Sequence, residues 1–161
     1  MLDFVRQVLF LYLAHVIQTT WIPNIKILGI VPDVVIVTIV WIALTSGGMR
    51  ATALAFCAGF MQDAYLPSEL GLNALSKSAI AFAIAELRGR VVAETPHVQI
   101  LMICAAVLAH DFIFYIVHSG VGVIEVPYFW LRFGLGRAIY TGIVSGLVVY
   151  TLQLLQRYFT R

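Results

Sequence analysis

Apolar residues occur along the chain in six long runs, which are separated by short stretches containing proline, glycine or charged residues. A helix that crosses the hydrocarbon core of a bilayer needs about 20 predominantly apolar residues. In lipid, each segment must satisfy its own backbone polar groups, which favours helices even where valine and isoleucine are abundant. We therefore predict a polytopic bundle of six transmembrane helices, at 4–22, 34–45, 51–66, 71–87, 97–118 and 137–155.

Several of these predicted helices are bounded by start or stop signals. Pro32 and Asp33 precede the second helix, where a carboxylate is stabilised by the helix N-terminus. Pro67 ends the third helix, and Thr95 followed by Pro96 is typical of a helix start. These signals place the boundaries independently of the hydrophobic runs.

Two parts of the pattern leave alternatives open. The second and third predicted helices are short, so together they could form one re-entrant hairpin instead of two spans. The connection at 119–136 is the longest and is rich in glycine and aromatic residues. We expect it to lie in the membrane interface, where aromatic side chains are favoured.

The composition agrees with a membrane protein. Of 161 residues, 61% are apolar and 11% are charged, and the mean hydropathy is +0.96. A soluble domain has about 25% charged residues, so this chain has too little polar surface to face water on all sides. A net charge of +2 excludes a nucleic-acid-binding protein with a basic surface. The length accommodates one domain, residues 1–161.

Basic residues in the predicted connections indicate an orientation. Positively charged residues are enriched in cytoplasmic connections. With both termini in the cytoplasm, six basic residues lie inside: Arg6, Arg50, Arg88, Arg90, Arg157 and Arg161. Three lie outside: Lys26, Arg132 and Arg137. This distribution predicts cytoplasmic termini and an even number of spans.

Polar residues at similar depth in different predicted helices indicate an internal network. A charged side chain near the bilayer centre costs about 2.5–3.5 kcal/mol on insertion scales, so each needs a partner. We predict a buried polar network in the outer third of the membrane, in which Lys77 bridges Asp63 and Asp111, with contributions from Gln18 and Arg137. The alternative is that Asp63 and Arg137 reach the outer headgroups and leave a simple pair of Lys77 with Asp111.

Small residues recur at spacings that allow helices to approach closely. Ala51, Ala55 and Gly59 lie on one stripe of the third predicted helix, and Gly142 and Gly146 form a GxxxG pattern on the sixth. These residues are predicted to pack either within the bundle or against a partner protein.

The sequence contains no recognisable catalytic motif. It has no GxSxG, HExxH, P-loop or GxGxxG pattern. Neighbouring residues on a helix point about 100° apart, so we do not expect His110 and Asp111 to converge on a metal. Cys57 and Cys104 each lie in an apolar run and are expected to behave as small hydrophobic residues. We predict no enzymatic activity, no metal and no cofactor.

Three stretches of the chain resemble the bacterial rod shape-determining protein MreD family. They are PDVVIVTIV at 32–40, GFMQDAYLPSELGLNAL at 59–75 and RAIYTGI at 137–143. The resemblance extends from about residue 32 to the end of the chain. The matched positions are Pro32, Asp33, Gly59, Asp63, Leu70, Gly71 and Leu75.

The resemblance implies a scaffold or adaptor of the cell-wall elongation machinery in the bacterial inner membrane, without catalytic activity. It implies MreC as the main partner, with RodA, a penicillin-binding transpeptidase and, indirectly, MreB. The fold is also similar to that of the six-helix substrate-binding subunits of energy-coupling-factor transporters. The alternative function is therefore binding of a small, vitamin-like molecule in an outer cavity.

Overall fold

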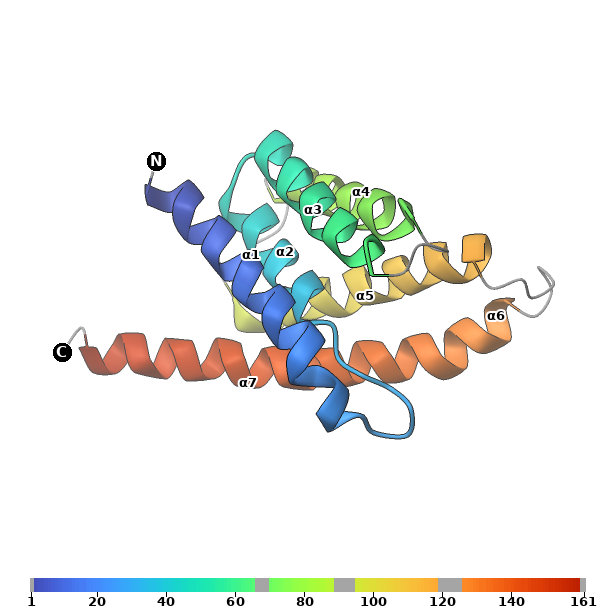
Figure 1. The fold of residues 1–161 in the computed structure, drawn as a ribbon. Helices are drawn as coiled ribbons and strands as arrows, with labels where there is room; N and C mark the ends of the chain where they lie inside the picture. Colours follow the sequence, from blue (N-terminus) through green and yellow to red (C-terminus); the bar gives the residue numbers. More distant parts are fainter. Residues whose placement is uncertain (1, 66–69, 89–94, 119–125, 160–161) are drawn as a thin grey trace.

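A computed structural model describes residues 2–65, 70–88, 95–118 and 126–159, with side chains as far as Thr151. The helices are drawn in Figure 1. Their bounds are α1 Leu2–Thr20, η1 Ile22–Ile25, α2 Val34–Thr45, α3 Gly48–Asp63, α4 Leu72–Leu87, α5 Pro96–His118, α6 Val126–Phe129, η3 Trp130–Gly134 and α7 Leu135–Phe159. The described part of the chain contains no β-strand, which confirms the predicted all-α class.

The long helices fall on the six predicted segments, with ends that differ by a few residues. The second half of the 119–136 connection differs from the prediction. From Val126 onward it forms α6 and a π-helical turn, η3, which continue directly into α7. Residues 119–125 lie outside the described residues. The apolar and aromatic residues that were expected to lie in the interface therefore extend the last helix.

The lengths of the helices support fewer spans than predicted. Among the described residues, two helical segments are long and apolar enough to cross a membrane, Pro96–Val117 and Val126–Thr151. The apolar helix α2 has 12 residues, which is about 18 Å of helix against a hydrocarbon core of about 30 Å. The number of spans therefore does not follow from helix length alone.

Helix α2 forms the centre of the bundle. It packs against α1, α3, α4, α5 and α7, and Figure 1 shows the other helices arranged around it. Val35, Ile39 and Ala43 of α2 are almost completely buried. A helix that is apolar on all sides is stable only where other elements enclose it. The short length and uniformly apolar sequence of α2 are consistent with this inner position.

The remaining helices form pairs around α2. Helices α3 and α4 form the most extensive contact in the molecule, and α5 packs along α7. In Figure 1, α1 begins and α7 ends on the left, where the turn between α2 and α3 also lies. The end of α5 and the start of α6 lie on the right.

Candidate functional site

Five titratable side chains meet between α2, α4, α5 and α7, and we call them the charged cluster: Asp33, Lys77, His110, Asp111 and Arg137. The first four are buried, and the Arg137 side chain keeps an exposed fraction of 29%. Asp33 precedes α2, Lys77 lies on α4, His110 and Asp111 are neighbours on α5, and Arg137 lies on α7. The cluster therefore connects four separate helices.

Lys77 lies at the centre of the charged cluster. Its Nζ donates to Asn73 Oδ1 at 3.0 Å, lies 3.0 Å from His110 Nε2 and is 3.7 Å from Asp33 Oδ2. An ammonium group carries three donors and no acceptor. Asn73 Oδ1 thus accepts a hydrogen bond from the ammonium, His110 Nε2 lies within hydrogen-bond distance of it, and the Asp33 carboxylate forms an ion pair with it.

His110 links Lys77 to the carboxylate of Asp111. The His110 Nδ1 lies 3.2 Å from Asp111 Oδ1, while its Nε2 faces Lys77 Nζ. A neutral imidazole with its proton on Nδ1 donates to Asp111 and accepts at Nε2 from Lys77. His110 can therefore satisfy both contacts without carrying a charge.

Arg137 connects the two carboxylates of the cluster. Its Nη1 donates to Asp111 Oδ1 at 3.0 Å, and its Nη2 donates to Asp33 Oδ2 at 3.4 Å. The planar guanidinium presents donors in a fixed fork that suits carboxylate oxygens. Arg137 thus ties the start of α7 both to α5 and to the start of α2.

Asp33 is the N-cap residue of α2 as well as an ion-pair partner. Its Oδ1 accepts from the backbone N–H of Ile36 at 2.9 Å, while its Oδ2 faces Lys77 and Arg137. Its own backbone N–H donates to Thr141 Oγ1 at 3.1 Å. One residue therefore starts the central helix and binds it to α4 and α7.

The charged cluster is electrically balanced, with Lys77 and Arg137 against Asp33 and Asp111. Burial of ions is costly, and attraction offsets this cost only when geometry is good and hydrogen bonds are complete. Removing one partner from such a pair typically costs about 3–5 kcal/mol, because a buried charge is left uncompensated. The arrangement therefore holds the four helices together only while both signs are present.

Asp63 forms a separate polar contact at the start of α4. Its two carboxylate oxygens accept from the backbone N–H groups of Gly71, Asn73 and Ala74, and from Asn73 Nδ2, at 3.0 to 3.1 Å. The first backbone N–H groups of a helix have no partner within the helix. Asp63, at the end of α3, supplies these partners and fixes the start of α4 beside it.

The structure brings Lys77, Asp111 and Arg137 into one cluster but places two other predicted network members elsewhere. Asp63 is connected to Lys77 only through Asn73, because its oxygens are occupied by the start of α4. The carboxylate paired with Lys77 is that of Asp33, so the predicted bridge from Lys77 to Asp63 is wrong.

Gln18 lies outside the charged cluster. Its Oε1 accepts from the backbone N–H of Val34 at 2.8 Å, and its Nε2 donates to the carbonyl oxygen of Pro32 at 3.1 Å. These are backbone groups at the start of α2, which lack partners within that helix. Gln18 therefore fixes the position of α1 against the start of α2.

Sequence reasoning left four members of the site out of the predicted network: Asp33, Asn73, His110 and Thr141. Asp33 was predicted only as a helix start, whereas it pairs with Lys77 and Arg137. Asn73 precedes Lys77 by four residues, a spacing that places two side chains on the same face of a helix. Sequence reasoning considered His110 only as a possible metal ligand beside Asp111, whereas in the structure its Nδ1 lies 3.2 Å from Asp111 Oδ1. Only long-range packing brings Thr141 to Asp33, so no local pattern indicates this contact.

The family-motif positions at the start of α4 have different structural roles. Gly71 has a φ of +91°, a conformation that favours glycine, and it is the N-cap of α4. No atom lies within 4 Å of a Cβ added there, so backbone conformation explains this glycine. Leu70 and Leu75 are exposed, at 65% and 64%, and contribute apolar surface.

The small residues of α3 lie against α4. A Cβ added to Gly59 would come within 2.5 Å of Ala74 Cα, which is backbone and cannot move aside. Ala51 and Ala55 are buried on the same stripe of α3. This stripe is used for packing within the chain.

The two glycines of α7 lie against α5. A Cβ on Gly142 would lie 2.7 Å from Cys104 Sγ, and one on Gly146 would lie 3.4 Å from Ile100 Cδ1. The GxxxG pattern thus allows α7 to approach α5 closely. It is covered by this chain and is not open to a partner.

The described residues contain no cluster of metal ligands. No group of three His, Cys, Asp or Glu side chains among them is placed to hold a metal ion. Cys57 and Cys104 are free thiols, and Cys104 Sγ donates to the carbonyl oxygen of Ala138 at 3.5 Å. The charged cluster connects α2, α4, α5 and α7 through ion pairs and hydrogen bonds.

Comparison with known proteins identifies the family. Searches of curated proteins and of solved structures found no match. The expected similarity to substrate-binding subunits of energy-coupling-factor transporters therefore has no support, and neither does the alternative function based on it. The family model described as rod shape-determining protein MreD matches residues 1–159. The chain belongs to this family of membrane proteins that determine rod shape.

Proposed function

We propose that the protein is a non-catalytic adaptor that helps to assemble the cell-wall elongation machinery in the bacterial inner membrane. Its family has a role in rod shape determination. The observation that carries the proposal is that the buried charges of the bundle bind one another. A catalyst or carrier would instead expose such groups to a substrate cavity.

The proposed placement has all six long helices in the membrane and both termini in the cytoplasm. The start of α1 and the end of α7 lie on the same side of the molecule in Figure 1, which agrees with an even number of spans. The excess of basic residues in the predicted inner connections favours the same orientation. The paired charges of Lys77, Asp33 and Arg137 reduce the cost of placing the short inner helices in lipid.

The proposed main partner is MreC, with RodA and a penicillin-binding transpeptidase in the same assembly and MreB connected indirectly. The small-residue stripes are covered inside the bundle, so partner helices would meet other surfaces. Large apolar side chains are exposed on α3 and α7, for example Phe60 at 51% and Leu147 at 66%. These faces contact lipid or a partner helix.

Copurification from membranes tests the proposal. The tagged full-length chain should retain MreC in mild detergent. A photo-crosslinking residue at Phe60, Leu147 or Phe82, which are exposed on α3, α7 and α4, should react at one face more than at the others. Equal crosslinking from all three positions, or absence of every elongation protein from the purified material, would contradict the adaptor function.

A further inference from the structure

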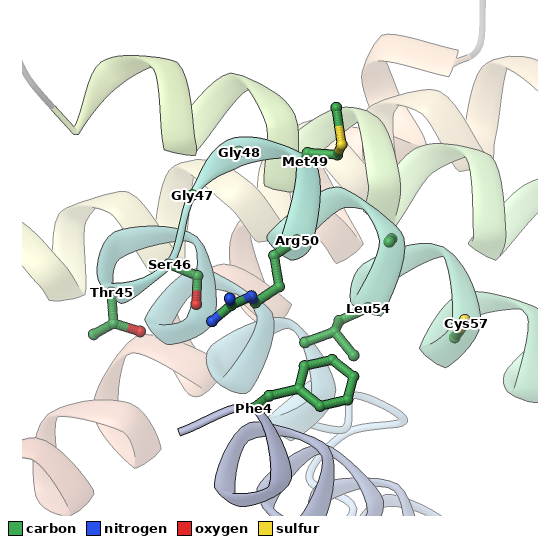
Figure 2. Close-up of a pocket in the computed structure, with 10 residues that line it drawn as sticks. Phe4, Thr45, Ser46, Gly47, Gly48, Met49, Arg50, Leu54 and Cys57 are labelled. Carbon is green, nitrogen blue, oxygen red and sulfur yellow. The ribbon is translucent and has the colours of Figure 1, made fainter. Parts of the chain in front are cut away.

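A cavity of about 780 Å³ opens at the turn between α2 and α3, where the start of α1 passes (Figure 2). Its polar lining includes Thr45, Ser46 and Arg50, and its apolar lining includes Phe4, Leu54 and Cys57. In Figure 2 the Arg50 side chain points toward Ser46, while Phe4 and Leu54 lie together on the other side. The cavity is thus divided into a polar half and an apolar half.

The polar half carries positive charge that is not neutralised within the described part of the chain. Arg50 is exposed and forms no hydrogen bond or ion pair with any described residue. Arg88 adds a second guanidinium to the turn, because its Nη1 donates to the carbonyl oxygen of Ser46 at 2.8 Å. Glu86 approaches Gly48 from α4 but does not line the cavity. The charge of the cavity therefore favours an anion.

The first turn of α3 adds donors on the same side. Gly47 is the N-cap of α3 and has no side chain to accept from the first backbone N–H groups. Open N–H groups at a helix start bind phosphate well, but the helix start alone does not define a site. The position of Arg50 in this same turn adds a full charge to the donors.

We propose that this cavity binds the phosphate group of an anionic phospholipid such as phosphatidylglycerol. The phosphate binds Arg50 and the first N–H groups of α3. This inference requires that the chain lies in a membrane, and it does not depend on the adaptor function.

The apolar half of the cavity favours a lipid over free phosphate. Leu54, Cys57 and Met61 follow one another on one stripe of α3 and lead away from the cavity. Phe4 contributes the facing wall from α1. An acyl chain can bury its surface along this stripe, whereas an inorganic ion gains nothing from it.

Native mass spectrometry of the purified full-length chain in a neutral detergent tests the proposal. Phosphatidylglycerol should be retained at about tenfold lower concentration than phosphatidylcholine with the same acyl chains. Arg50→Gln should weaken the retention of phosphatidylglycerol by about tenfold, the effect of losing one charged hydrogen bond. The matched control Arg132→Gln removes an exposed guanidinium that donates to Tyr128 and should leave retention unchanged.

Gly47→Asp provides a test that does not depend on the stability of the Arg50 variant. A Cβ at Gly47 meets no atom within 4 Å, so the side chain fits. The new carboxylate would cap α3 and raise the melting temperature, yet it would occupy the N–H groups and repel the phosphate. We expect a more stable protein that no longer retains phosphatidylglycerol.

Three results would overturn the proposal. The first is equal retention of the two lipids, and the second is unchanged retention in both Arg50→Gln and Gly47→Asp. The third is that inorganic phosphate or glycerol 3-phosphate binds as tightly as the lipid and displaces it. That result would assign the site to a free phosphate instead of a membrane lipid.

Discussion

At the scale of single residues, the most consequential feature is that each buried charge has a partner on another helix. Lys77 and Arg137 share Asp33, and Arg137 also binds Asp111. In a low-dielectric interior, the loss of one partner affects all the groups that remain. The stability of the protein should therefore depend on individual charges more strongly than on single apolar contacts.

Lys77→Met should destabilise the protein by about 3–5 kcal/mol, since Asp33 would lose its buried ammonium partner. Adding Asp33→Asn should recover part of this loss, because the double variant removes one charge of each sign. Thermal unfolding in detergent measures both effects. Lys26→Met, at an exposed position, is the control for loss of a lysine. A double variant that is less stable than Lys77→Met would contradict the pairing.

Asp63→Ala should destabilise the chain by about 3 kcal/mol or more, because three backbone N–H groups and the Asn73 amide lose their acceptor. Hydrogen exchange of the first turn of α4 should increase more than exchange in α5. Asp3→Ala, at an exposed residue paired with Arg6, is the matched control. Unchanged exchange at the start of α4 would show that Asp63 does not hold this turn.

The difference between Asp63 and Asp33 shows how far sequence reasoning reaches at this scale. Both carboxylates lie at a helix end, but only Asp63 was predicted to belong to the buried network, while Asp33 was predicted to begin a helix. Their partners depend on which helices lie beside them, and that is set by packing of the whole bundle. Asp63 therefore binds its neighbour α4, while Asp33 reaches Lys77 on α4 and Arg137 on α7.

At the scale of helices, the positions of the apolar runs follow from the sequence but the packing pairs do not. The boundaries of α2 were predicted from Pro32, Asp33 and the apolar run that follows. The spacing of Gly142 and Gly146 indicated a close approach, yet it could not distinguish α5 from a partner protein as the neighbour. The π-helical turn Trp130–Gly134, where Trp130 Nε1 donates to the carbonyl oxygen of Leu108 at 2.8 Å, has no local signal.

Gly59→Val should separate α3 from α4 and destabilise the protein by about 3 kcal/mol, because the new side chain would overlap the backbone of Asn73 and Ala74. Ala53→Val on the same helix adds similar volume at an exposed position and should change stability by less than about 0.5 kcal/mol. Melting temperatures of the two variants in the same detergent give the comparison. Equal melting temperatures would exclude the close α3–α4 approach.

At the scale of the whole molecule, the bundle combines a closed polar interior with a largely apolar exterior. The described side chains include many large apolar groups that are more than one third exposed, on α1, α3, α5 and α7. Soluble proteins rarely expose continuous apolar surface on this scale, whereas a membrane or a partner helix covers it. The family assignment agrees with this surface.

The central claim is that the charged cluster holds the bundle together and takes no part in chemistry. The most direct measurement is recovery of rod shape in cells that lack the native protein and carry paired neutral substitutions. Asp111→Asn alone should fail, because the carboxylate 3.0 Å from Arg137 loses its negative charge and the cluster keeps two cations against one anion. Asp111→Asn combined with Arg137→Gln removes one charge of each sign and should restore both the folded protein and rod-shaped cells. A double variant that folds in the membrane yet leaves the cells round would contradict the claim, since the charges would then act beyond holding helices together.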